Sequence, residues 1–205
     1  MKLIGVVKTV AAERVSEAVR LGLADLGENR LQEAEAKIPA VRGASEGGHP
    51  RWHMIGHLQR NKAARAARLF DRVHSVDGPE VALVLARAAR EAGRELPVMI
   101  EVNVSGEASK FGVTPADLEA LVLAVAALEG LKLDGLMTVG PQVERPELAR
   151  PAFARLRELR AGAERSSGLA LPQLSMGMSG DFEVAIEEGS TMVRVGSAIF
   201  GARGV

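Results

Sequence analysis

Two serine-containing turns near the end of the sequence have the composition of a phosphate-binding site. Residues 174–201 read LSMGMSGDFEVAIEEGSTMVRVGSAIFG, in which two short apolar runs each end in a turn. The first turn holds Ser179, the second holds Gly196 and Ser197, and a helix-like segment begins after each. Backbone N–H groups at helix starts bind phosphate. We therefore predict that the turns at 179–181 and 196–197 form one phosphate cup; the alternative is that the serines only cap their helices.

Lys8 is a candidate for covalent chemistry because it directly follows the apolar run LIGVV at 3–7. A lysine at such a position either extends into solvent or points toward a ligand site. In a partly apolar site its amine loses part of its preference for the charged form and can form a Schiff base with a carbonyl compound. A lysine, a carbonyl and a phosphate together indicate pyridoxal phosphate or an aldolase-type phosphosugar as the ligand.

Repeated strand–helix units must position these residues, because short β-branched or apolar runs alternate with amphipathic segments along the chain. The expected strands are 3–7, 24–26, 52–55, 72–76, 98–104, 131–139, 173–176 and 192–195. The expected helices lie near 11–21, 29–37, 60–69, 79–92, 115–128, 146–165 and 181–188. Eight such units favour an α/β fold, a single (β/α)8 TIM barrel with right-handed crossovers. Loops after strands 7 and 8 of such barrels bind phosphate, so Lys8 and the phosphate cup would share one mouth.

Length and composition exclude several classes of protein. The 205 residues contain no evident linker, so we expect one domain, 1–205, with a flexible surface loop at 42–50, RGASEGGHP. Lysine plus arginine equals aspartate plus glutamate, 26 each, so no overall charge attracts nucleic acid or an anionic membrane. No apolar run approaches the roughly 20 residues that cross a bilayer, and early charges argue against a secretory signal. The chain also lacks cysteine, so we expect a cytoplasmic protein without Cys-ligated zinc.

Three further sets of polar residues lie in or near expected strand ends. Asn29 either contacts a ligand at the barrel mouth or caps the following helix. Lys110 is either a secondary site for the ligand or the partner of Glu107, three residues earlier, in a salt bridge. His53 and His57 have the spacing H-x3-H, but no glutamate follows His53 and no third ligand is near, so no metal site is predicted.

Seven motifs, in order along the chain, resemble those of a known family. They are VVKT at 6–9, LGEN at 26–29, WHMIGHLQRNK at 52–62, HSVD at 74–77, NVSGEASKFG at 103–112, GLMTV at 135–139, and LSMGMSGDFEVAI with GSTMVRVGSAIFGAR within 174–203. In these motifs the sequence is similar to the pyridoxal phosphate homeostasis proteins (YggS/PROSC family), which share the barrel fold of the alanine racemase N-terminal domain. Relatives usually carry a helix before the first strand, so we expect one flank of this barrel to be less covered.

The resemblance implies a site for pyridoxal 5′-phosphate (PLP). Lys8 would hold PLP as a Schiff base, Arg194 would face the pyridine nitrogen, and Asn29 would lie beside the phenolic edge of the ring. The phosphate would be bound by the residues of the phosphate cup, Ser179, Gly196 and Ser197. Apart from the resemblance, the position of Lys110 makes it a candidate secondary PLP site, with the salt bridge to Glu107 as the alternative.

The type of residue at position 194 bears on what such a site can do. An arginine cannot accept a proton from the pyridine nitrogen, which weakens the ring as an electron sink and disfavours transamination. Alanine racemases add a tyrosine from a second domain, and this chain has no tyrosine. We therefore expect a monomeric, non-catalytic carrier that buffers PLP or delivers it to PLP-dependent apo-enzymes in vitamin B6 homeostasis. The alternatives are a weak PLP-dependent amino-acid racemase and a phosphosugar aldolase.

Overall fold

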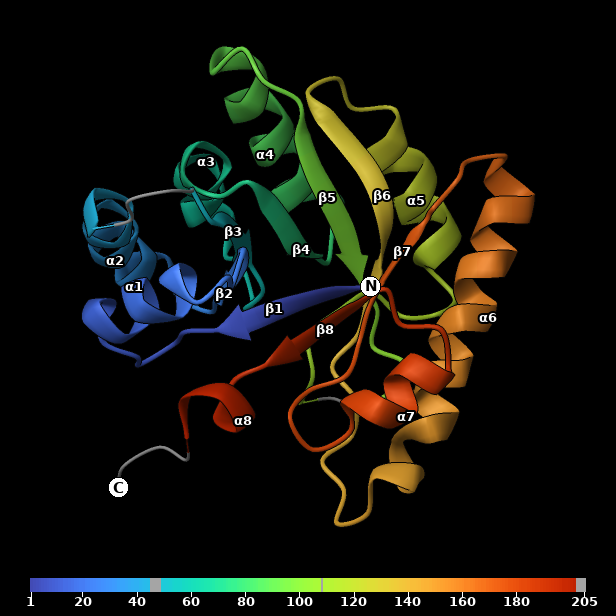
Figure 1. Ribbon diagram of the computed structural model, residues 1–205. Helices are drawn as coiled ribbons and strands as arrows, with labels where there is room; N and C mark the ends of the chain where they lie inside the picture. The colour runs from blue at the N-terminus through green and yellow to red at the C-terminus, as the bar shows by residue number, and fades with distance from the viewer. Residues whose placement is uncertain (45–48, 108, 202–205) are drawn as a thin grey trace.

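Eight parallel strands form a closed barrel in the computed structural model, which describes residues 1–44, 49–107 and 109–201. The strands follow one another in sequence order, and β1 pairs with β8 to close the barrel (Figure 1). The strands are β1 (Lys2–Val6), β2 (Asp25–Glu28), β3 (Arg51–Met54), β4 (Arg72–Val76), β5 (Leu96–Glu101), β6 (Leu131–Met137), β7 (Gln173–Ser175) and β8 (Met192–Val195). The helices are α1 (Ala12–Arg20), α2 (Leu31–Ala44), α3 (Arg60–Leu69), α4 (Pro79–Glu91), α5 (Leu118–Ala126), the 3₁₀ helix η1 (Pro146–Ala149), α6 (Arg150–Ser167), α7 (Phe182–Glu187) and α8 (Ser197–Phe200). The predicted TIM barrel is confirmed.

Helix α2 is longer than predicted, since it continues beyond residue 37 and ends at Ala44. Val41 is fully buried and extends the apolar face of the helix past Pro39, so contact with the barrel outweighs the backbone N–H that proline lacks. The predicted loop 42–50 therefore begins inside a helix. Its central residues, 45–48, lie outside the described residues.

The strands β5 and β6 end earlier than predicted, at Glu101 and Met137 rather than at 104 and 139. Beyond Glu101 the chain leaves the sheet and makes a single bridge, between Val102 and Val113, with the loop that follows. The residues freed from the two strands form loops at the mouth of the barrel. They are thereby available to line a ligand site.

Apolar side chains cover the outside of the barrel wall and part of its inside. A large cluster lies between the strands and the surrounding helices, and a separate cluster inside the barrel consists of Ile4, Met99, Met137 and Met192. In β6, Gly135 lies so close to β7 that a Cβ would be 2.1 Å from the backbone oxygen of Gln173. Across the described parts of the chain, no helix is both long and apolar enough to cross a membrane.

Candidate functional site

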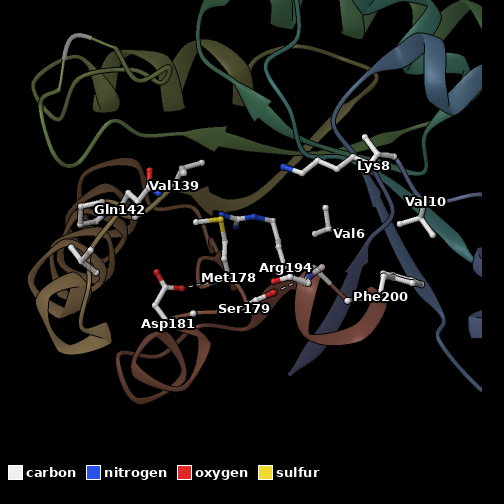
Figure 2. A pocket seen from close by; sticks show the side chains of 18 of the residues that line it. Val6, Lys8, Val10, Val139, Gln142, Met178, Ser179, Asp181, Arg194 and Phe200 are labelled. Atoms are coloured by element: carbon white, nitrogen blue, oxygen red, sulfur yellow. Dashed lines mark hydrogen bonds between the residues drawn. The ribbon is translucent and has the colours of Figure 1, made fainter. Parts of the chain in front are cut away.

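A cavity of about 910 Å³ opens beyond the carboxyl ends of β1, β6, β7 and β8. Figure 2 shows the Lys8 and Arg194 side chains reaching into the space between Val6 and Val139. Six of the seven residues expected from the sequence to bind the ligand line this cavity: Lys8, Lys110, Ser179, Arg194, Gly196 and Ser197. The barrel thus brings residues from both ends of the chain into one site.

The loops after β7 and β8 are joined to each other through Ser179. Its hydroxyl oxygen accepts hydrogen bonds from the backbone N–H of Gly196 at 3.1 Å and of Ala198 at 3.4 Å. The hydroxyl proton therefore remains to be donated toward the cavity. Asp181 closes its own turn by accepting from the backbone N–H of Met178 at 2.6 Å. The two turns that were predicted to form a phosphate cup do lie side by side.

Arg14 is a cavity residue that the sequence analysis missed. It lines the cavity and donates to the backbone oxygen of Phe200 at 2.9 Å, which ties α1 to α8. Its guanidinium places a positive charge near the phosphate cup, where the carboxylate of Asp181 also lines the wall. Nothing in the sequence marked Arg14, because one arginine at a helix start is usually solvent-exposed.

The backbone on either side of Lys8 is held by charged side chains of α2. Lys37, which is buried, donates to the backbone oxygen of Val7 at 2.6 Å and forms an ion pair with the buried Glu28. The N–H of Thr9 donates to Glu33 Oε2 at 3.1 Å, and Thr9 has a φ of +63°. A β-branched residue rarely adopts that conformation, so the surrounding contacts must hold it. The backbone at Lys8, directly after β1, is therefore held in place from both sides.

Lys37 was also missed by sequence analysis, although a signal was present. Lys37 lies among Ala34, Ile38 and Val41 on the buried side of α2. A charged residue on an apolar helix face requires a buried partner. The sequence could have shown this requirement but not that Glu28, at the end of β2, would satisfy it.

Arg194 is buried within the barrel and is fixed by two hydrogen bonds. Its guanidinium donates to Ser175 Oγ at 2.7 Å and to the backbone oxygen of Thr138 at 2.8 Å. Burial lowers the pKa of Arg194 to about 10, although the charge of Glu101 opposes that shift. Arg194 therefore remains a cation at neutral pH. Since a guanidinium has five N–H groups, these two contacts leave donors for a ligand in the cavity.

Glu101 is a buried carboxyl group at the end of β5 whose Oε2 has no hydrogen-bond partner. Burial and the neighbouring charge of Asp77 raise the pKa of Glu101 to about 7, although Arg194 opposes the shift. A buried acid with such a pKa changes its charge in the neutral range. Sequence analysis placed the end of this strand three residues later and so missed Glu101.

Replacing Glu101 by glutamine is expected to flatten the pH dependence of stability. The folded pKa lies above the unfolded value, so the carboxyl contributes stability below pH 4.5 that is lost as pH rises through about 7. The loss amounts to up to about 3 kcal/mol. Relative to wild type, Glu101→Gln should gain free energy of unfolding between pH 5 and pH 8. Urea titrations at both pH values measure this gain, and parallel pH profiles for the two proteins would contradict it.

Asn29 is the expected site residue that does not line the cavity. It follows β2 directly, and its Oδ1 is buried without a hydrogen-bond partner. The interpretation as a helix cap is wrong, because α2 begins only at Leu31 and the amide oxygen accepts no backbone N–H. Its contact with a ligand stays a prediction.

Lys110 makes the salt bridge that its spacing predicted, with a distance of 2.7 Å between its amine and Glu107 Oε1. The amine also donates to the backbone oxygen of Gly140 at 3.2 Å. Because Lys110 also lines the cavity, it is a second lysine beside the candidate site. Its role as a secondary ligand site remains a prediction.

The two histidines of the H-x3-H pattern lie in different surroundings. His53 is inside the barrel, hydrogen-bonded to His74 and Asp25, whereas His57 pairs with Asp77 at 3.2 Å beyond the carboxyl ends of β3 and β4. Within 1–44, 49–107 and 109–201, no group of three or more His, Cys, Asp or Glu side chains is arranged to hold a metal ion.

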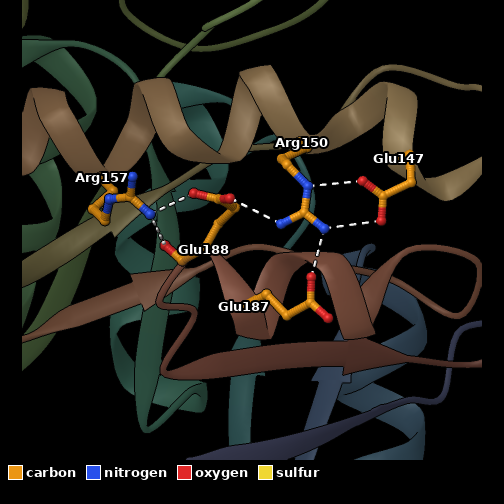
Figure 3. A network of polar contacts seen from close by, with 5 residues as sticks. All are labelled: Glu147, Arg150, Arg157, Glu187 and Glu188. Atoms are coloured by element: carbon orange, nitrogen blue, oxygen red, sulfur yellow. Dashed lines mark hydrogen bonds and ion pairs between the residues drawn. The ribbon is translucent and has the colours of Figure 1, made fainter.

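An ion-pair network anchors the short helix α7, which follows the first turn of the phosphate cup (Figure 3). Arg150, at the start of α6, makes two 2.8 Å contacts to Glu147 and also pairs with Glu187 and Glu188. Arg157, two turns along α6, pairs with Glu188 as well. Exposed pairs add little stability singly. The network instead joins α7 to α6 and limits where the phosphate cup can move.

Comparison with known sequences places the whole chain among related proteins. Residues 1–204 match the sequence profile of the alanine racemase N-terminal domain. A pyridoxal phosphate homeostasis protein from Aquifex aeolicus (strain VF5) is 44% identical over 202 residues, which cover 98% of this chain and 87% of that protein. The protein of the same name from Escherichia coli (strain K12) is 39% identical over 204 residues, covering 98% and 85%.

Solved structures show the same similarity in three dimensions. PipY of Synechococcus elongatus PCC7942, solved with PLP bound, has a TM-score of 0.89 and 35% identity, covering 98% of this chain and 92% of PipY. PipY without PLP has a TM-score of 0.91. An alanine racemase of Clostridium difficile 630 shares the fold, with a TM-score of 0.77 at 16% identity, and this chain covers 53% of it.

Proposed function

This chain belongs to the family of pyridoxal phosphate homeostasis proteins, and on that basis we propose that it binds PLP at the barrel mouth and acts in PLP homeostasis. One observation supports this most strongly. A lysine, a buried arginine and two serine-containing turns from distant parts of the chain line one cavity. These are the groups needed to capture an aldehyde, contact a ring nitrogen and bind a phosphate.

The residues present fit PLP in charge and in hydrogen-bonding capacity. The hydroxyl of Ser179 and the loop of Gly196 and Ser197 would bind the phosphate, with Arg14 adding positive charge. The unpartnered Oδ1 of Asn29 is a buried polar atom at the same end of the barrel that a ligand group could satisfy.

Each side chain then has a distinct task. Bound PLP would supply an aldehyde that an amine captures reversibly and a ring that withdraws electrons. Lys8 would hold the aldehyde as a Schiff base, on a backbone made rigid by Lys37 and Glu33. Arg194 would donate toward the pyridine nitrogen without protonating it, because its pKa of about 10 keeps its proton at neutral pH. Such a site retains PLP but does little to activate what is bound to it.

Delivery of PLP to apo-enzymes, rather than turnover, is the role that we propose for this site. The absence of any tyrosine in the chain removes the second base that alanine racemases use. Incubating the PLP-loaded protein with L-alanine should leave the chirality unchanged, whereas an apo-enzyme mixed with it should regain activity. Sustained racemisation would favour the enzyme alternative.

We also propose that the protein is a monomer in the cytoplasm. The barrel that closes within one chain supports a monomer, and a sequence without cysteine suits the reducing cytoplasm. Light scattering coupled to size exclusion should give a mass near 21.7 kDa, and cell fractionation should find the protein in the cytoplasmic fraction. A dimer mass or a membrane-associated fraction would contradict the corresponding half of the proposal.

The direct test is to add PLP, reduce with borohydride and locate the label. The protein should gain a visible absorbance band, and borohydride should convert the link into a stable adduct. Tryptic digestion and mass spectrometry should then place the adduct on Lys8. The absence of both a band and an adduct at saturating PLP would remove the proposal.

A further inference from the structure

A continuous chain of hydrogen bonds crosses the inside of the barrel and ends on Arg194. Asp25 Oδ1 lies 2.9 Å from His53 Nε2, and His53 Nδ1 lies 2.9 Å from His74 Nε2. His74 Nδ1 lies 3.0 Å from Ser175 Oγ, which in turn lies 2.7 Å from the Arg194 guanidinium. We call these five residues, Asp25, His53, His74, Ser175 and Arg194, the barrel relay.

The barrel relay is enclosed along its whole length and joins opposite ends of the barrel. None of its five residues is more than 5% exposed. Asp25 is the first residue of β2, at the amino-terminal end of the barrel, where Arg51 donates to its second oxygen at 2.7 Å. Arg194 lines the cavity at the other end. The relay therefore connects the closed end of the barrel to the proposed ligand site.

Burial and charge determine which atom of the relay carries each proton. Burial would raise the pKa of Asp25, but the hydrogen bonds from His53 and Arg51 outweigh it and lower the pKa to about 2. Asp25 is thus a carboxylate that accepts from the Nε2–H of His53. Burial lowers the pKa of His53 and of His74, so both rings are neutral at pH 7.

One arrangement of protons then satisfies every contact. A neutral imidazole has one donor and one acceptor nitrogen, so His53 Nδ1 must accept from the Nε2–H of His74. His74 Nδ1 must in turn accept from the hydroxyl of Ser175. With its proton directed at His74, the Ser175 oxygen presents lone pairs to Arg194. All the hydrogen bonds run in the same direction, from the arginine to the carboxylate.

We propose that the barrel relay positions Arg194 for its ligand. Ser175, His74 and His53 are positioning residues, and Asp25 sets the direction of the bonds between them. The hydrogen bonds that Arg194 donates to Ser175 Oγ and to the Thr138 carbonyl oxygen hold two nitrogens of the guanidinium, which fixes its plane. The identity of the ligand as PLP rests on the proposed function, whereas the proton arrangement does not.

The charges that surround the relay keep both histidines neutral. Arg72 on β4 and Lys2 on β1 oppose protonation of either ring, and Arg194 adds to this effect at His74. Asp25 acts in the opposite direction on His53, but burial outweighs it. The relay should therefore keep its proton arrangement through the neutral pH range. The neighbour of Arg194 that does titrate in that range is Glu101, whose pKa is about 7 and whose charge acts on Arg194 from the end of β5.

Removing the Ser175 hydroxyl tests the positioning role. Ser175→Ala leaves Arg194 with an unsatisfied buried N–H, and we expect PLP affinity, followed by absorbance titration, to fall roughly 10-fold or more. Ser175→Thr keeps a hydroxyl and should restore most of the affinity. The matched control is Ser190→Ala, since the Ser190 hydroxyl is buried next to the end of β7 and donates to the backbone oxygen of Met176 at 2.8 Å. The Ser190→Ala protein should be less stable than wild type but should bind PLP with the same affinity.

Nitrogen NMR of the histidine rings in the protein without PLP tests the relay independently of any ligand. His53 and His74 should both appear as neutral Nε2–H tautomers at pH 7 and above. Ser175→Ala should shift the Nδ1 signal of His74, and Ser190→Ala should leave it in place.

The outcomes separate the two proposals. A protonated ring, or an Nδ1–H tautomer at either histidine, would overturn the relay even if PLP binds. Equal affinity in Ser175→Ala and wild type would overturn the positioning role. If both histidines are Nε2–H tautomers but the protein binds no PLP, the proton arrangement is confirmed and the proposed function is wrong.

Discussion

Lys8→Ala should abolish the adduct that borohydride fixes after PLP is added. The Lys8 side chain extends into the cavity, and alanine offers no amine that could capture the aldehyde (Figure 2). The fold should persist, because the neighbouring backbone is held by other side chains, with Lys37 on Val7 and Glu33 on Thr9. Absorbance spectra and intact mass before and after borohydride measure the loss, and circular dichroism checks the fold.

Lys110→Ala is the matched control, because Lys110 lines the same cavity. It should keep the Lys8 adduct, and any secondary site would be seen as a lower stoichiometry at excess PLP. An unchanged stoichiometry and release rate would end the idea of a secondary site at Lys110. An absorbance band that survives in Lys8→Ala but disappears when Lys110 is also replaced by alanine would show that PLP is the ligand. It would also show that Lys110, rather than Lys8, forms the covalent link.

Gly135→Ala should unfold or strongly destabilise the protein, through lack of space rather than an unusual backbone angle. The added Cβ would lie 2.1 Å from the oxygen and 2.7 Å from the carbonyl carbon of Gln173, both backbone atoms of the adjacent strand. Neither atom can move without breaking the pairing of Gly135 with Gln173 between β6 and β7. We expect a loss of about 3 kcal/mol or more. Urea unfolding followed by circular dichroism measures it.

Gly162→Ala provides the control of opposite sign. Gly162 lies inside α6, and its added Cβ would meet only the tip of the Arg165 side chain, at 4.0 Å. Alanine should therefore stabilise the helix by about 1 kcal/mol. A Gly135→Ala protein as stable as wild type would refute the close approach of β6 and β7.

Patterns local in the sequence predicted much of the fold and most of the site. Alternating apolar runs and amphipathic segments predicted every strand of the barrel, because burial imposes the same periodicity wherever such elements occur. The composition of two turns predicted that these turns lie together, and a spacing of three residues predicted the pair of Lys110 and Glu107. The position of Lys8 at the end of β1 followed from the order of elements alone.

Contacts between distant strands were decided only by the tertiary structure. The relay joins residues up to 169 positions apart, Asp25 and Arg194, and which face of a strand points inward depends on the register in which the barrel closes. The same holds for Glu101, whose pKa rises because burial removes water around it, and for Lys37, whose partner Glu28 lies on another element. A sequence shows that a buried polar group needs a partner, but only the closed barrel determines which atom comes within reach.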